Sequence, residues 1–209
     1  MSEIEEELEA ETHGNYLFVY AQIAFNQLRR FANIESPASL PEGWRKYTAD
    51  SERSFELTEC RVLSVLATAL FIEAYAFDYC ARKRSASFAK TYLDKLDTPA
   101  KWIVTTQLLC PPGLDPGNEL FERLKKLFGF RNKLVHYKTK KGESVYRPPE
   151  FPQELHPSKN LNLIIDILSE LKRLDASEES SADLYLRHIE SWFKYCAKDR
   201  RFYPIPWEV

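Results

Sequence analysis

VLSVLATALFIEAYAFDYC, residues 62–80, is the stretch of sequence that decides the fold. It is apolar on nearly every face of a helix, and Glu73 and Asp78 are its only charged side chains. A helix that is apolar all round has to be buried, either in lipid or inside a protein. Two carboxylates within the run and a polar flank argue against a membrane span. We therefore expect residues 51–84 to form the central helix of a bundle.

Helical periodicity continues on both sides of this segment. In residues 14–33, large apolar side chains recur every three or four positions, and an acidic arm over residues 1–13 can extend that helix upstream. Thr98 is predicted to cap a helix that has Pro99 in its first turn. The same spacing predicts further helices over residues 86–96, 98–109, 117–138, 158–175 and 182–198.

Proline and glycine interrupt the helical pattern. Residues 34–50 form a loop, and residues 139–157 form a polar connection with room for a short hairpin arm around 144–146. Residues 199–209 read as an extended aromatic tail that docks on the bundle or on a partner. No convincing strand pattern occurs. The predicted fold is an all-α, up-and-down bundle of four to six helices in one domain, residues 1–209.

Composition narrows the function classes. The 209 residues are 44% hydrophobic and 29% charged with a net charge of −2, so the whole surface is not built to attract nucleic acid. The four cysteines have neither CxxC nor zinc-ligand spacing and are expected to be reduced thiols. The acidic start does not resemble a signal peptide. We expect a cytoplasmic protein with no metal, no cofactor and no membrane partner.

Common enzyme motifs such as GxSxG, HExxH and the Walker loop are absent, but one short segment contains candidate catalytic residues. In FRNKLVHY, residues 130–137, Asn132 and His136 are four apart and share a helix face. Arg131 lies about 140° round the helix from His136, but its long side chain can bend toward the same place. Arginine binds phosphate oxygens bidentately, and histidine moves protons near neutral pH. Arg131, Asn132 and His136 together are therefore suited to cleaving a phosphodiester bond.

The surroundings of this string are basic. Residues 120–141 hold only one acid, Glu122, against eight basic side chains at positions 123, 125, 126, 131, 133, 138, 140 and 141. Such a strip can steer RNA or can simply be a solvated face. The side chains expected to contact RNA are Lys125, Lys126, Lys133 and Lys138. The other histidines, His13, His156 and His188, are expected at the surface or at helix caps.

The RNKLVH string resembles the R-x4-6-H motif of HEPN domains, and the long helix ALFIEAYAFDYCARK before it resembles that family's layout. The resemblance implies a four- or five-helix bundle that dimerises, with the motifs of both subunits lining one cleft. Active members are metal-independent endoribonucleases. Carried over, His136 is the general acid or base at the ribose 2′-OH or the 5′-oxygen, Arg131 stabilises the phosphorane, and Asn132 orients substrate or histidine. The product carries a 2′,3′-cyclic phosphate.

The resemblance also implies supporting residues and partners. Glu73 is expected to bind Arg131, and Tyr137 supports the site. Toxins of the family that a nucleotidyltransferase antitoxin controls often have tyrosine two positions after the histidine. Lys138 stands there, so adenylylation of that tyrosine is not expected. The expected function is a homodimeric ribonuclease, a toxin or phage-defence effector that an antitoxin or regulatory protein can control.

Two other functions fit the sequence. The chain can be a non-catalytic helical module that binds a nucleotide, RNA or a protein partner, with Arg131 merely paired to Glu73 or Asp78 and His136 merely ending its helix. It can also be a small-molecule-binding bundle with a pocket beside Glu73.

Overall fold

The computed structural model describes residues 3–35, 49–136 and 151–198, and every regular element in these ranges is helical. This confirms the all-α prediction. Two 3-10 turns, Gln153–Leu155 and Ala176–Glu178, precede the last two helices. The described residues form these α-helices: α1 Glu3–Glu35, α2 Ala49–Lys83, α3 Ala86–Tyr92, α4 Thr98–Leu109, α5 Glu119–Val135, α6 Pro157–Leu174 and α7 Glu179–Lys198.

The acidic arm extends α1 upstream, as the sequence allowed, and the helix begins at Glu3. Another helix end differs from its predicted position. Asp97, not Thr98, caps α4, because its carboxylate accepts the backbone N–H of Ala100 at 2.8 Å and also suits the positive end of the helix. The predicted hairpin arm and aromatic tail lie outside the described residues.

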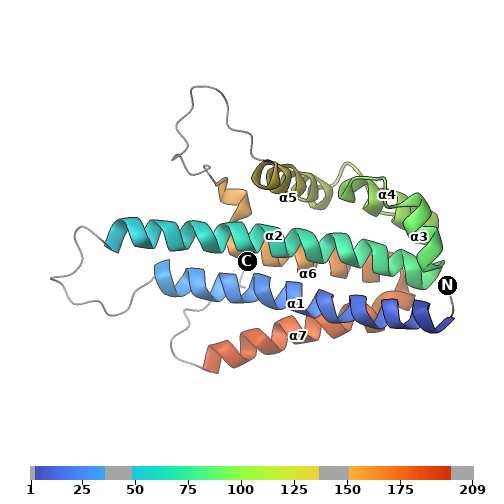
Figure 1. The fold of residues 1–209 in the computed structure, drawn as a ribbon, viewed down its shortest axis with the longest axis horizontal. Helices are drawn as coiled ribbons and strands as arrows, with labels where there is room; N and C mark the ends of the chain where they lie inside the picture. Colours follow the sequence, from blue (N-terminus) through green and yellow to red (C-terminus); the bar gives the residue numbers. More distant parts are fainter. Residues whose placement is uncertain (1–2, 36–48, 137–150, 199–209) are drawn as a thin grey trace.

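Helix α2 is the centre of the bundle, as predicted. It contacts α1, α3, α4, α5 and α6, and Figure 1 shows α1 antiparallel beside it, with α4 and α5 along its opposite edge. Its buried residues include Phe71, Ile72, Tyr75 and Tyr79. Trp102 of α4 donates its indole N–H to the carbonyl of Ile72 at 3.1 Å and lies parallel to the ring of Tyr75. The apolar run therefore buries itself in protein.

Residues 52–83 of α2 form the one helix in the described part of the chain that is long and apolar enough to cross a bilayer, and 56% of its apolar window is buried inside the bundle. A buried core helix meets the same criteria of length and composition. Packing against five other helices accounts for the apolar composition of α2.

Polar contacts fix the register of α6 on α2. Near one end, Asn160 donates to the hydroxyl of Ser64 at 3.2 Å, and near the other, the Tyr79 hydroxyl donates to Asp175 at 2.8 Å. Both pairs are separated by 96 residues, so the two helices run parallel. Because these groups are buried or half-buried, an unpaired one would carry a desolvation cost.

The Asp175 carboxylate is the centre of a hydrogen-bond network. Besides Tyr79, it binds the Lys83 ammonium at 2.8 Å and the backbone N–H of Ser177 at 3.0 Å. Burial acts to raise the pKa of Asp175, but the hydrogen bonds from Lys83, Ser177 and Tyr79 outweigh it and hold that pKa well below the usual range. Burial and the hydrogen bonds to Cys110 and Asp175 raise the pKa of Tyr79, which stays a donor.

Asp175→Asn keeps the shape of the side chain and removes its charge. We expect a loss of about 1–3 kcal/mol in the free energy of unfolding at pH 7, the range for hydrogen bonds to a charged group. Because folding lowers the pKa of Asp175, the wild-type advantage is full above the unfolded pKa, about 4, and shrinks as the pH falls toward the folded pKa. Urea unfolding at pH 7 and at pH 3 measures the difference in free energy of unfolding between wild type and Asp175→Asn. An equal difference at the two pH values would contradict the network.

Candidate active site at the end of helix α5

Helix α5 carries the RNKLVH string in its last turn. Asn118 begins the helix by accepting the backbone N–H of Phe121 at 2.8 Å. The helix ends at Val135, before the predicted end. His136 is its C-cap, and the backbone N–H of His136 donates to the carbonyl of Asn132 at 2.9 Å. The side chains that fasten α5 to the core are Phe121, Leu124, Leu127, Phe128 and Phe130.

Arg131 points toward α2. Its Nη2 lies 3.9 Å from Oε2 of Glu73, and its Nη1 donates to Oδ1 of Asn132 at 3.0 Å. The contact expected between Glu73 and Arg131 is present. Asp78, the other partner considered for this arginine, instead accepts from Arg82 at 2.8 Å. Arg131 is therefore joined to the site residues Glu73 and Asn132, while its side chain stays 28% exposed.

Sequence reasoning missed Lys101, which shares the same carboxylate. Its ammonium Nζ lies 3.1 Å from Oε1 of Glu73, and its side chain is only 7% exposed. A pattern was available in the sequence, because Lys101 stands among the buried positions of α4 together with Thr98, Trp102, Thr105 and Thr106. A lysine at a core position is almost never fully buried without a partner.

Two cations compete for one carboxylate at this junction of α2, α4 and α5. Lys101 holds the closer oxygen of Glu73, whereas Arg131 is beyond hydrogen-bonding distance of the other. The cluster of these three side chains has a net charge of +1. Arg131 is thus oriented by Glu73 and Asn132 without being neutralised, which leaves it able to bind an anion.

His136 stands apart from this cluster. It is exposed, and among the described residues its imidazole makes no hydrogen bond or ion pair. The structure therefore brings Arg131, Asn132 and Glu73 together and leaves His136 at the helix end one turn beyond Asn132. Tyr137 lies outside the described residues.

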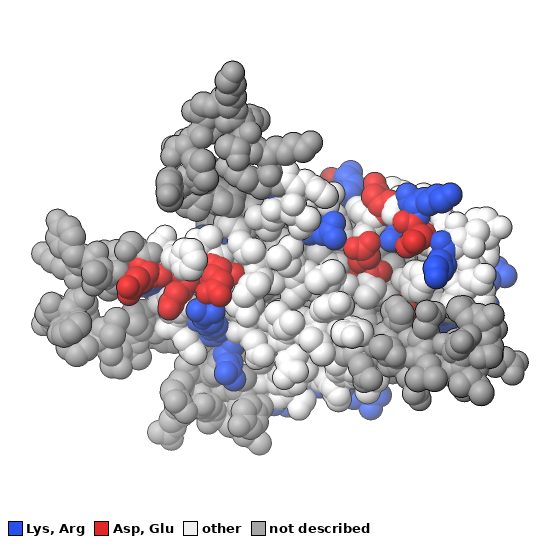
Figure 2. All heavy atoms as spheres, viewed as in Figure 1, with Lys and Arg blue, Asp and Glu red and all other residues white. Residues whose placement is uncertain are grey.

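Some residues of the basic strip, residues 120–141, form ion pairs with acidic side chains, so the strip is not a continuous surface of unpaired positive charge. Arg123 pairs with Asp166 of α6 at 2.6 Å, and Lys125 pairs with Glu122 at 2.6 Å. In Figure 2, Lys and Arg are interspersed with Asp and Glu on the face in view. The described strip residues that are exposed and make no ion pair with another described residue are Lys126 and Lys133. Lys138 and the basic residues 140 and 141 lie outside the described residues.

The other described histidines have structural roles, as predicted. His156 caps α6 by accepting the backbone N–H of Ser158 at 3.2 Å, and burial lowers its pKa. His188 is exposed on α7, with its ring 4.7 Å from that of Phe18. The side chain of His13 is outside the described part.

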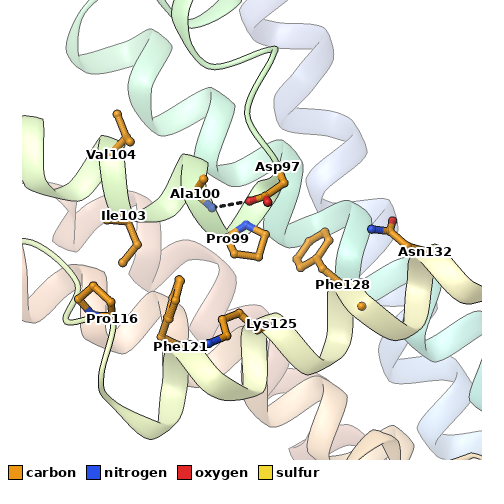
Figure 3. Close-up of a pocket in the computed structure, with 11 residues that line it drawn as sticks. Asp97, Pro99, Ala100, Ile103, Val104, Pro116, Phe121, Lys125, Phe128 and Asn132 are labelled. Carbon is orange, nitrogen blue, oxygen red and sulfur yellow. Dashed lines mark hydrogen bonds between the residues drawn. The ribbon is translucent and has the colours of Figure 1, made fainter.

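A groove between α4 and α5 adjoins the cluster. Its volume is about 560 Å³, and Figure 3 shows its apolar walls with Asn132 at one end. A Cβ added at Gly129 would meet no atom within 4 Å, so the space above that residue is open. Glu73 does not line this groove, and the pocket expected beside Glu73 stays a prediction. The lining residues are Asp97, Pro99, Ala100, Ile103, Val104, Pro116, Phe121, Lys125, Phe128, Gly129 and Asn132.

The described residues offer no metal site. They contain no group of three His, Cys, Asp or Glu side chains placed to hold an ion. Cys60, Cys80 and Cys110 are buried and form no disulfide with one another, and burial raises the pKa of Cys60 and of Cys80.

Comparison with known proteins gave no match for this chain, whether to a protein-family model, to a curated protein or to a solved structure.

The stability costs of Lys101→Met and Arg131→Met show whether each residue has a structural role in the bundle. Lys101→Met leaves Glu73 without its closer partner, and we expect it to cost about 1–2 kcal/mol, less than a fully buried pair because Glu73 is 34% exposed. Arg131→Met should cost under about 1 kcal/mol, as for partly exposed pairs. Urea unfolding at pH 7 gives both values. An equal or larger cost for Arg131→Met would mean that this arginine is part of the scaffold.

Proposed function

We propose that this chain is a metal-independent endoribonuclease that acts as a homodimer. The observation that most supports the proposal is the state of Arg131. It is oriented by Asn132 at 3.0 Å and Glu73 at 3.9 Å, yet it keeps its charge uncompensated because Lys101 holds the nearer oxygen of Glu73. A guanidinium held in this way is suited to a phosphate in the transition state.

The reaction needs only groups that the chain supplies. His136 removes the proton from a ribose 2′-OH, the 2′-oxygen attacks phosphorus, and the bond from phosphorus to the 5′-oxygen breaks. The leaving 5′-oxygen takes a proton from an imidazolium, and the products are a 2′,3′-cyclic phosphate and a 5′-OH. A homodimer would present two copies of His136, one for each proton transfer. Arg131 stabilises the charge on the phosphorane, and Asn132 keeps the guanidinium in place.

Lys126 and Lys133 are the cations that would contact the RNA backbone. Both are exposed on α5, where an approaching polyanion is attracted. Lys125 and Lys138 are the other two lysines that we propose contact RNA. Lys125 also forms an ion pair with Glu122. The biological role we propose is that of a cytoplasmic toxin or phage-defence effector, restrained by an antitoxin or regulatory protein.

A second function is favoured by a specific observation. Catalytic histidines are oriented by a further group, but His136 has no hydrogen-bond partner among the described residues. The alternative is a non-catalytic module that binds a nucleotide, RNA or a protein partner through the α4–α5 surface. It would bind with Arg131 and Asn132 and would not turn over its ligand.

RNA cleavage in the presence of EDTA separates the two functions. We expect His136→Ala to lower the rate by about 10²- to 10⁴-fold, the usual contribution of general acid–base catalysis. His188→Ala is the matched control, since it removes an exposed histidine from α7, and it should stay within about twofold of wild type, in line with its surface position. The products should carry 2′,3′-cyclic phosphate ends.

In cells, expression of the wild-type chain should slow growth, and His136→Ala should relieve the effect. If the wild-type protein leaves RNA intact yet binds it, the binding module replaces the ribonuclease. Equal cleavage by wild type and His136→Ala would mean that the histidine is not catalytic.

A further inference from the structure

We infer that the groove between α4 and α5 binds a nucleobase of the RNA, next to the phosphate that Arg131 contacts. The ligand class rests on the proposed function, whereas the groove stands on its own geometry. Four kinds of evidence support this occupant: the shape of the groove, its aromatic walls, the free donors of Asn132, and the charges at its rim.

The walls of the groove are suited to a flat apolar ring. Phe121 and Phe128 project from α5, facing Pro99 and Ile103 of α4 across the opening (Figure 3). A volume of about 560 Å³ is large enough for a base with its ribose. Proteins that read single-stranded RNA stack unpaired bases on aromatic side chains in this manner.

Asn132 links the groove to the arginine. Its Oδ1 accepts from Arg131, and because a guanidinium can only donate, this contact fixes which end of the amide is oxygen. The NH₂ group of Asn132 therefore faces the groove, as Figure 3 shows, and makes no hydrogen bond with another described residue. Two free donors at the end of an apolar groove suit the ring nitrogens and carbonyl oxygens of a base.

Charge at the rim determines which way a nucleotide enters. Lys125 lies over the ring of Phe121, 5.5 Å from its centroid, and belongs to the α5 wall. Asp97 stands on the α4 side, where its carboxylate caps the helix through Ala100. A phosphate is repelled by Asp97 on the α4 rim, whereas on the α5 rim Lys125 shares its charge with Glu122 at 2.6 Å. The base would enter the groove while its phosphate stays beside Arg131, away from Asp97.

Gly129 offers a direct test, because it lines the groove and a Cβ added there meets no atom within 4 Å. Gly129→Leu occupies the space, and Gly129→Ala is the matched control, since it also removes the helical glycine but leaves most of the volume. The probes are AMP, GMP, CMP and UMP, with inorganic phosphate alone as the comparison. Binding to wild type and both variants is followed by NMR titration of the backbone amides.

We expect at least one mononucleotide to bind wild type 10-fold or more tightly than inorganic phosphate. Gly129→Ala should bind it within threefold of wild type, and Gly129→Leu should weaken it at least 10-fold while leaving phosphate binding unchanged. Mononucleotides that bind no better than phosphate, or that bind Gly129→Leu as well as Gly129→Ala, would overturn the inference. A change of oligomeric state in Gly129→Leu with unchanged nucleotide binding would assign the groove to a second copy of the chain instead.

The cleavage assay keeps this inference separate from the proposed function. Nucleotide binding that depends on Gly129, without RNA cleavage, supports the base-binding groove and overturns the ribonuclease. RNA cleavage that is the same in Gly129→Leu and Gly129→Ala, in rate and in the bases at the cut sites, supports the ribonuclease and overturns the groove.

Discussion

Burial of the apolar helix α2 is the constraint on which the rest of the structure depends. Three polar side chains of α2, Ser64, Glu73 and Tyr79, contact polar groups of α4, α5 and α6. Ser64 meets Asn160 of α6, and Tyr79 meets Asp175 at the end of that helix. Between them, Glu73 meets Lys101 of α4 and lies near Arg131 of α5. The site is thus part of the register of the bundle and is not added to its surface.

Glu73 has a double effect because a carboxylate has two oxygens. One oxygen neutralises a lysine that the core could not otherwise hold, and the other orients an arginine without binding it closely. If Lys101 were absent, Glu73 and Arg131 would form a simple neutral pair. The buried lysine of α4 therefore determines whether Arg131 is a structural or a functional cation.

The sequence predicted the parts of this arrangement that local patterns encode. The apolar run of α2 predicted a central helix, and the resemblance of the motif to a known family predicted the Glu73–Arg131 contact. Lys101 was missed because lysine is usually solvated, and its partner is 28 positions away in sequence. The end of α5 at Val135 was missed because no glycine or proline follows closely. The groove could not be predicted, since it arises only when α4 and α5 pack side by side.

Neighbouring residues at the end of α5 serve both features of the site. Arg131 turns toward α2 and Asn132 toward the groove, because consecutive helical positions differ by about 100°. The Asn132 oxygen accepts from Arg131, and Asn132 makes no hydrogen bond to the imidazole of His136. A histidine that acts as acid and base needs an orienting group, and the described residues of the chain place none in hydrogen-bonding contact with His136. The groove, by contrast, is lined entirely by residues that the structure describes, so base binding and proton transfer make separate demands on the end of α5.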